Sequence, residues 1–206
     1  SPEGLPPYDR GLLMMEMELF RHWLCGRHLG LALSEGEEHM LDETFELLVA
    51  NALEQPRVFV HRDYHSRNLM ITHPPTPGIL DFQDAVAGPV TYDLVSLLKD
   101  AYIHWPLRQV DEWAWGFFQL AVQSAVLRDS DEARFQRWFD LMGVQRHVKV
   151  AGIFARLYRR DAKVEYLKDI PLVLDYIRDM VPRYAELEGL GRLISERVAP
   201  ALKVAA

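Results

Sequence analysis

The sequence predicts a mainly α-helical fold that carries one small β element. Apolar residues recur at helical spacing through most of the chain, which indicates amphipathic helices with one buried face. Between two of these helical regions lie three short apolar runs, 58–60, 69–71 and 79–80, separated by polar or proline-rich turns. Runs of this length are typical of short strands. A chain of 206 residues is long enough for a substantial core, so we expect one large lobe.

Composition and charge exclude several classes of protein. Hydrophobic residues make up 49% of the chain and charged residues 26%, as in ordinary globular proteins. The formal net charge of −7 argues against nucleic-acid binding, which needs clustered Lys and Arg. The single cysteine, Cys25, excludes an internal disulfide and fits a reducing compartment. We find no apolar run of membrane-spanning length and no signal peptide, and we therefore expect a cytoplasmic protein with no membrane partner.

The helical regions follow one another along the chain. Residues 1–8 are rich in Pro and Gly and are expected to form a linker or interlobe segment. Ser34 and Glu37 have the spacing of a capping box at the start of the second helix. Gly143 is expected to end or kink the helix that precedes it. The apolar patterns predict helices over residues 10–24, 34–51, 92–105, 111–127, 131–142, 145–160, 171–184 and 186–198.

Residues 58–84 contain the groups that a phosphate-transfer reaction would need. Asp63 ends an H-R-D tripeptide that follows the first apolar run, Asn68 comes after four more residues, and Asp81 ends the third run. A carboxylate at a loop tip can orient an acceptor hydroxyl and take its proton, so Asp63 is the expected catalytic residue. The amide oxygen of Asn68 and the carboxylate of Asp81 suit Mg²⁺, a hard cation that prefers oxygen ligands and neutralises phosphate charge. The spacing H-R-D-x-x-x-x-N, followed by L-D-F, is typical of the catalytic loop of protein-kinase-like phosphotransferases.

The residues that follow Asp81 carry a resemblance to a known family. Protein kinases continue with D-F-G, whereas this chain reads D-F-Q and then G-P-V-T-Y-D-L. That continuation resembles the aminoglycoside phosphotransferase (choline-kinase-like) family of small-molecule kinases, over about Leu5 to Leu193. The resemblance implies the C-terminal helical lobe of the protein-kinase-like fold over residues 9–200, with ATP and Mg²⁺ as cofactors. It also implies that Asp93, in Y-D-L, braces the backbone of the catalytic loop.

Within the family, H-R-D-Y-H-S-R-N-L-M and L-M-G-V-Q-R-H-V-K-V-A-G-I-F-A-R are most similar to bacterial kinases of cell-wall recycling. Those kinases phosphorylate the anomeric hydroxyl of N-acetylmuramate and N-acetylglucosamine, so the likeness implies an amino-sugar substrate; an aminoglycoside or another small molecule is the alternative acceptor. Gln83 and Asp84 then lie where they would meet sugar hydroxyls. Lys149 and Arg156 would form a positive wall of the substrate pocket among the helices of residues 92–198, because arginine pairs with carboxylates such as that of N-acetylmuramate. The alternative for these two basic residues is a solvated helix face.

The chain lacks the features of the small N-terminal lobe of kinases. That lobe supplies a phosphate-covering loop and a strand lysine paired with a helix glutamate. No glycine-rich stretch and no lysine precede Lys99 in this sequence. We therefore expect a C-terminal lobe alone, inactive by itself and able to self-associate through the surface that an N-terminal lobe would cover.

Two other functions remain as alternatives. His61, Asp63 and His65 alternate along the sequence and would share one face of a strand, with His73 nearby, so they could bind Zn²⁺ or Fe²⁺ in a metal-dependent hydrolase. A lone lobe could also be a non-catalytic binding module. The hydrolase leaves Asn68 and the L-D-F sequence without a role, which favours the kinase.

Overall fold

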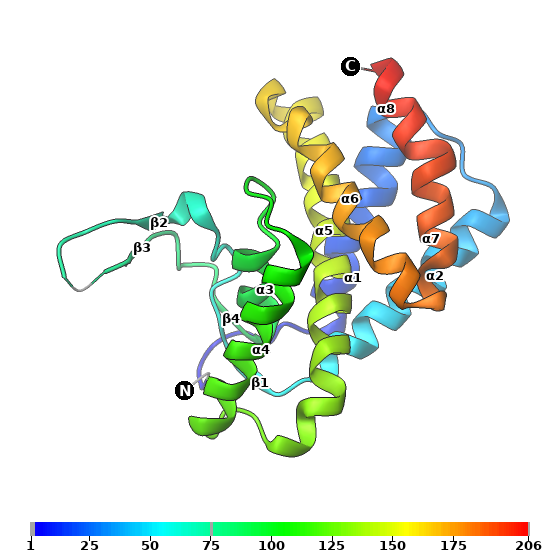
Figure 1. The fold of residues 1–206 in the computed structure, drawn as a ribbon. Helices are drawn as coiled ribbons and strands as arrows, with labels where there is room; N and C mark the ends of the chain where they lie inside the picture. The colour runs from blue at the N-terminus through cyan, green and yellow to red at the C-terminus, as the bar shows by residue number, and fades with distance from the viewer. Residues whose placement is uncertain (1–2, 75, 206) are drawn as a thin grey trace. The chain divides into compact units, whose positions relative to one another are not determined.

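A computed structural model describes residues 3–74 and 76–205 (Figure 1). The first two residues of the predicted linker, and Pro75 in the predicted turn, lie outside the described residues. The chain folds as two compact units: unit 1 comprises residues 1–9 and 51–143, and unit 2 comprises residues 10–50 and 144–206. No helix in the described ranges has both the length and the apolar character needed to span a membrane.

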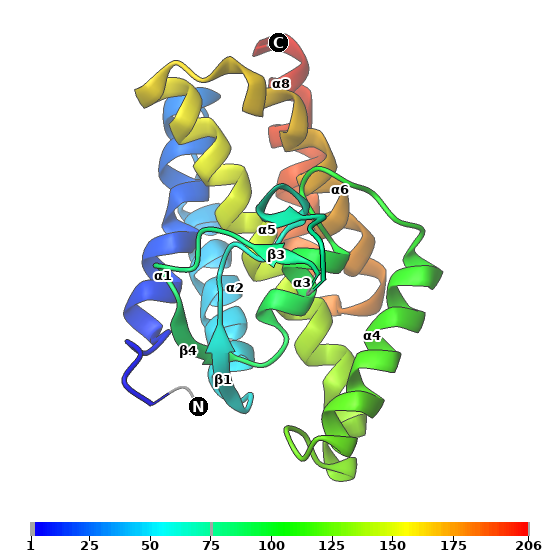
Figure 2. The same ribbon diagram turned by 90° about the vertical axis from the view of Figure 1, so that its left-hand side faces the viewer.

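Unit 1 contains a two-stranded antiparallel sheet of β1 (Arg57–Val60) and β4 (Val86–Pro89), which run side by side (Figure 2). The strand β1 was predicted, whereas β4 was not, because its Gly-Pro ending reads as a turn. The backbone of Tyr8 extends this sheet by donating a hydrogen bond to the carbonyl of Ala87 over 2.9 Å. Tyr8 is 2% exposed and packs edge-on against the ring of Tyr92. The end of the predicted linker is therefore packed structure.

A second pair of strands forms a hairpin that projects from the rest of unit 1 (Figure 1). A 3₁₀ turn, η2 (Ser66–Asn68), leads into β2 (Leu69–Met70), which pairs antiparallel with β3 (Gly78–Ile79). Leu69 lies opposite Ile79 in this pairing. The three strands predicted from the apolar runs are therefore confirmed, although β2 and β3 have only two residues each.

The helices of unit 1 follow β4 along the chain. They are α3 (Tyr92–Leu98), α4 (Leu107–Gln123), the 3₁₀ turn η3 (Asp129–Asp131) and the first part of α5 (Glu132–Asp161). The prediction of one helix over residues 92–105 was too long, because the chain turns at Asp100, whose carboxylate accepts a hydrogen bond from the backbone of Tyr102. The prediction that Gly143 ends a helix was wrong, since α5 runs on through it, whereas the alternative of a kink stays a prediction. Gly143 instead leaves room for Lys99, whose Nζ is 3.0 Å from the buried carboxylate of Asp140.

The regular elements among the described residues of unit 2 are all helices, joined by short segments such as residues 30–34. Glu37 accepts a hydrogen bond from the backbone N–H of Ser34 over 2.7 Å, and Ser34 Oγ accepts one from the N–H of Glu37 over 3.3 Å, which confirms the predicted capping box. Besides the later part of α5, the elements are α1 (Arg10–Leu19), the π-helical η1 (Phe20–His28), α2 (Glu35–Leu53), η4 (Val164–Asp169), α6 (Ile170–Met180), η5 (Val181–Arg183), η6 (Ala185–Leu187), α7 (Glu188–Leu193), the π-helical η7 (Ile194–Val198) and α8 (Ala199–Ala205).

Two helices of unit 2 approach each other closely at Gly152 of α5. A Cβ atom at this position would lie 2.3 Å from the carbonyl carbon of Leu19 and 2.4 Å from the backbone nitrogen of Phe20. Both distances are far below van der Waals contact, so only glycine fits here. The contact falls where α1 widens into the π-helical η1, and it fixes the packing of α5 against the first helix of the chain.

Candidate active site

The expected catalytic residue, Asp63, lies in a loop between β1 and η2 whose backbone is held by one carboxylate. Asp93, in the first turn of α3, accepts hydrogen bonds from the N–H of His61 over 2.6 Å and from the N–H of Arg62 over 3.1 Å. Charge-assisted hydrogen bonds of this kind are stronger than neutral ones. The implied role of Asp93 as a brace for the catalytic loop is therefore confirmed, and Asp63 follows directly after the two braced residues.

Two residues of the site have backbone angles that side chains rarely adopt. Arg62 has φ 75° and Asp81 has φ 67°, both in the left-handed region. Such conformations cost free energy and persist where the surroundings fix them, and they concentrate at functional sites. Asp81 is therefore itself at a strained position, and Asp63 directly follows one. Both carboxylates are proposed to take part in the chemistry.

Asn68 connects the loop with the end of the hairpin. Its Nδ2 donates a hydrogen bond to the carbonyl of Asp63 over 2.9 Å, which leaves Oδ1 as the acceptor that can face a ligand. Its own carbonyl accepts a hydrogen bond from the N–H of Leu80 over 3.0 Å. Because Leu80 immediately precedes Asp81, this backbone bond brings the second expected metal ligand to the neighbourhood of the first.

Asp81 is exposed and has a neighbour of its own. The amide Nε2 of Gln83 donates a hydrogen bond to the Asp81 carboxylate. The carbonyl of Asp84 accepts a long hydrogen bond, 3.4 Å, from the guanidinium of Arg62. Gln83 and Asp84 are both exposed, and their contacts with a sugar stay predictions.

The donor groups of this site fit Mg²⁺. Asn68 offers a neutral amide oxygen and Asp81 a carboxylate, and hard divalent cations take oxygen ligands of these two kinds. The zinc alternative required His61, Asp63 and His65 to alternate along a strand. Because β1 ends at Val60, these three residues lie beyond the strand, and the alternative loses its geometric basis. No group of three His, Cys, Asp or Glu side chains within the described ranges lies close enough to hold a metal.

A second bracing carboxylate, Asp100, was missed in the sequence. It is buried, and its Oδ2 accepts a hydrogen bond from the N–H of Ser66 over 2.9 Å, at the start of the turn that carries Asn68. Tyr102 follows it and packs on the same turn, with the guanidinium of Arg67 only 3.4 Å from the centre of its ring. No sequence signal identified Asp100, because it was placed inside a helix that ends before it.

The two basic residues predicted for the substrate wall lie in unit 2. The ammonium of Lys149 is 2.9 Å from a carboxylate oxygen of Glu16, and both side chains are almost fully buried. A buried ion pair of this kind loses much free energy if one partner is withdrawn, so Lys149 is held by Glu16 in this structure, and its contact with substrate stays a prediction. Arg156 is half-buried, and its contact with substrate stays a prediction.

Comparison with known proteins agrees with this geometry. A model of the phosphotransferase enzyme family matches residues 1–135. A relative from Pseudomonas putida named N-acetylmuramate/N-acetylglucosamine kinase is 48% identical over 197 residues, covering 96% of this chain and 58% of the relative. A protein of the same name from Neisseria meningitidis is 46% identical, and the match covers 96% of this chain and 59% of that protein. Another from Pseudomonas aeruginosa is 47% identical, and the match covers 93% of this chain and 56% of that protein.

The chain thus spans less than three fifths of the length of the curated relatives it matches. The matched part nevertheless contains the H-R-D loop, the turn with Asn68 and the strand end with Asp81, because all of these lie within residues 1–135. On the family match and the identity to these relatives, the chain belongs to the phosphotransferase enzyme family.

Proposed function

We propose that the protein containing this chain transfers the γ-phosphate of ATP to the anomeric hydroxyl of N-acetylmuramate or N-acetylglucosamine, the two sugars in the name of its relatives. The observation that carries the proposal is the brace on the catalytic loop, in which one carboxylate, that of Asp93, holds the two residues before Asp63. A loop held in this way presents Asp63 in a fixed place beside Asn68 and the end of β3, as positioning catalysis requires.

The proposed reaction assigns one step to each group. Asp63 orients the sugar hydroxyl and accepts its proton while the hydroxyl oxygen bonds to the γ-phosphorus and ADP leaves. Asn68 Oδ1 and the Asp81 carboxylate would hold Mg²⁺, which neutralises the charge of the phosphates. An anomeric hydroxyl is more acidic than an ordinary alcohol, so a carboxylate of modest basicity is sufficient.

The substrate contacts are part of the same proposal. Gln83 and Asp84 are exposed just after the proposed metal ligand, where their amide and carboxylate can hydrogen-bond to sugar hydroxyls. Arg156 would pair with the lactyl carboxylate of N-acetylmuramate. Because ATP is a cytoplasmic metabolite, the proposed reaction also places the protein in the cytoplasm, in the reuse of cell-wall sugars.

We further propose that this chain alone transfers little phosphate. Its relatives are longer by roughly two fifths of their length, and no lysine precedes Lys99 to take the role of the kinase strand lysine. The missing N-terminal lobe is thus expected to be supplied by the part of the protein that this chain does not span.

The proposal is tested by ³¹P NMR on the protein extended to the length of its relatives. ATP and Mg²⁺ are added with N-acetylmuramate, N-acetylglucosamine or an aminoglycoside in separate samples. We expect a new sugar 1-phosphate resonance with the amino sugars. The Asp63→Asn variant should lose at least about 1,000-fold in rate while keeping its unfolding curve, and Asp129→Asn, an exposed aspartate of η3, serves as the matched control.

Each other outcome corrects a different part of the proposal. A phosphorylated product with the aminoglycoside alone would keep the reaction class and overturn the amino-sugar substrate. Full activity of Asp63→Asn would overturn the role of Asp63. No product with any acceptor would leave the protein as a binding module.

A further inference from the structure

Unit 2 contains a cavity that the proposed phosphate transfer does not use. It has a volume of about 800 Å³, which lies in the range of small-molecule sites. Its lining comes from four parts of unit 2: the end of η1, the end of α5, the segment from η4 into α6, and the segment from η7 into α8. All of its lining residues belong to unit 2, and none lies within the 58–84 segment that carries the candidate active site.

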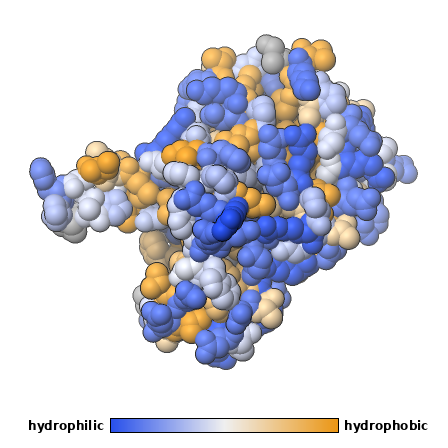
Figure 3. Space-filling view, in the orientation of Figure 1, coloured by the Kyte–Doolittle hydropathy of each residue, from blue (hydrophilic) through white to orange (hydrophobic). Residues whose placement is uncertain are grey.

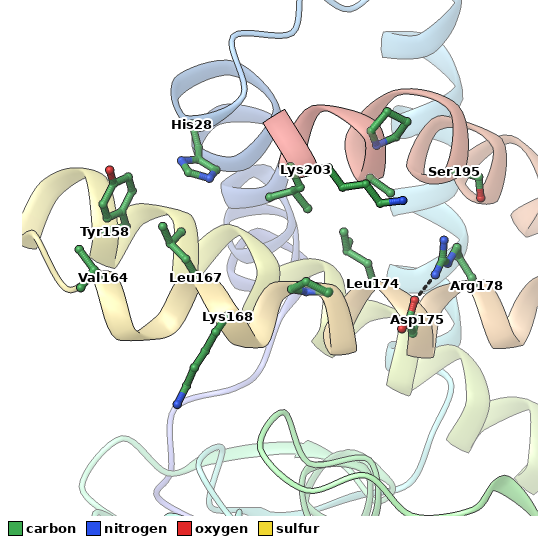
Figure 4. A pocket seen from close by; sticks show the side chains of 14 residues that line it. His28, Tyr158, Val164, Leu167, Lys168, Leu174, Asp175, Arg178, Ser195 and Lys203 are labelled. Carbon is green, nitrogen blue, oxygen red and sulfur yellow. Dashed lines mark hydrogen bonds and ion pairs between the residues drawn. The ribbon is translucent and has the colours of Figure 1, made fainter. Parts of the chain in front are cut away.

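The middle of the cavity is apolar. Leu167 and Leu174 lie side by side along it (Figure 4), and Leu202 of α8 is also part of its lining. Pro171 and Val164 extend the same surface. An apolar lining of this extent binds the hydrocarbon part of a ligand through the removal of both surfaces from water.

One end of the cavity holds a buried histidine with an unsatisfied nitrogen. His28 is 6% exposed, and its Nδ1 has no hydrogen-bond partner among the residues that the structure describes. Its ring lies edge-on to Tyr158, with 5.4 Å between the ring centres, and the two side chains lie together at this end (Figure 4). Burial and the nearby Arg159 lower the pKa of His28, so its imidazole is neutral at pH 7. His28 therefore contributes an uncharged imidazole ring to this end of the cavity.

The opposite end of the cavity is positively charged. Arg178 and Ser195 lie there, beyond Leu174 from His28, and Lys203 lies between His28 and these two residues, while Lys168 points away from the centre (Figure 4). Arg178 forms an ion pair with Asp175, the only carboxylate in the lining, and Lys203 makes no ion pair within the described part of the chain. The lining therefore carries an excess of positive charge in a chain whose net charge is −7. Such a local reversal of sign favours an anionic ligand.

We propose that this cavity binds an amphipathic organic acid, with its anionic group beside Arg178 and Lys203, its apolar body along Leu174, and its far end against the uncharged ring of His28. The ligand is a small molecule with a carboxylate or phosphate at one end of a hydrocarbon skeleton. The proposal does not depend on the reaction at Asp63, because every residue that carries it lies in unit 2 and none of them is a candidate for catalysis.

The test is isothermal titration calorimetry of the 206-residue chain with decanoate. Decyltrimethylammonium, which has a tail of the same length and the opposite charge, is the matched ligand. We expect saturable binding of one decanoate and none of the cationic probe. Lys203→Glu, at an exposed position, should weaken decanoate binding about fivefold, because it replaces an attractive charge by a repulsive one in a solvated setting.

Three further variants show where decanoate binds. Ala199→Trp places an indole into the cavity and should abolish binding, with circular dichroism as the check on folding. Arg192→Glu makes a comparable charge change on an exposed residue outside the lining, and Phe82→Ser removes an exposed apolar residue of the hairpin in unit 1; both should leave binding unchanged. Equal binding of the cationic probe, an unchanged affinity in Lys203→Glu, or no saturable heat up to about 1 mM decanoate would overturn the proposal.

Discussion

The two halves of the segment from residue 61 to residue 84 are built in opposite ways. Residues 61–68 are held by buried or half-buried carboxylates: Asp93 accepts two of their N–H groups and Asp100 accepts a third. The described residues of 69–84 expose large apolar side chains, among them Ile71 at 99% and Phe82 at 65%. Figure 3 shows hydrophobic side chains at the surface of this projecting hairpin.

This difference separates what the chain organises by itself from what needs a partner. Hydrogen bonds from backbone N–H groups to charged carboxylates fix the loop in the isolated chain, so the proposed catalytic carboxylate is positioned without further help. Exposed apolar side chains gain free energy only when another surface covers them, and contiguous patches of them mark interaction sites. The exposed apolar side chains of the hairpin are therefore candidates for such a contact.

The largest effect is expected from breaking the first brace with Asp93→Asn. An amide has only one acceptor oxygen and would turn an N–H towards one of the two backbone donors. We expect the free energy of unfolding to fall by about 2–3 kcal/mol, as for the loss of hydrogen bonds to a charged group. Urea unfolding measures this change, and in the longer protein phosphate transfer should fall by about 100-fold.

Asp129→Asn is the control for that experiment, because Asp129 is an exposed aspartate of η3 in the same unit. Its unfolding should match that of the unmodified chain within about 0.5 kcal/mol. Equal stability of the Asp93 and Asp129 variants would show that the loop does not depend on the carboxylate.

Asp100→Asn should have a smaller effect of a different kind. It weakens the bond to Ser66 at the start of the turn that carries Asn68, so the proposed metal ligand loses its support while Asp63 keeps its own. We expect an apparent Mg²⁺ affinity about tenfold weaker, with kcat restored at high Mg²⁺, as is typical when an outer partner of a metal ligand is lost. A fall in kcat that excess Mg²⁺ does not restore would contradict this positioning role.

Substitutions in the hairpin should leave the stability of the chain unchanged, unlike the substitution of Asp93 that holds the loop. Replacing Ile71 and Phe82 together by Ser removes apolar surface that no described residue covers, so the free energy of unfolding should change by less than about 0.5 kcal/mol. If the isolated chain self-associates through this patch, sedimentation velocity should show less association in the double variant. A large loss of stability would show instead that the hairpin packs in the isolated chain and would remove the contrast with residues 61–68.

The sequence predicted the local parts of this site and missed the distant ones. The spacing from Asp63 to Asn68 and the strand end at Asp81 are properties of neighbouring residues, and the structure places them together through the bond from Leu80 to Asn68. The support from Asp100 joins residues 34 positions apart, and no periodicity reveals such a contact.

Long-range packing also explains two features of the helical part that the sequence did not reveal. The glycine at residue 143 suggested a helix end, yet the helix continues, because tertiary contacts override a weak local preference. Lys149 was predicted to line a pocket from its place on a helix, but its partner Glu16 lies far away in the sequence. Neither contact leaves a pattern in the residues around it.

Glu37 in unit 2 is another carboxylate that accepts a hydrogen bond from the backbone. Replacing it should change the free energy of unfolding less than the Asp93 substitution does. The N–H of Ser34 is the main cause that lowers the pKa of Glu37 from 4.5 to about 2, and Arg197 adds to it. Because the carboxylate is ionised more readily in the folded chain, its contribution to stability is complete above pH 4.5 and is lost as the pH falls towards 2. Comparing urea midpoints of the unmodified chain and Glu37→Gln should therefore show a difference that is largest near pH 6 and shrinks on acidification. A difference that does not change with pH would contradict the role of the ionised carboxylate. Solvent screening keeps the difference below about 1 kcal/mol. A carboxylate at the surface should therefore stabilise the chain less than Asp93, which holds the backbone of the proposed catalytic loop.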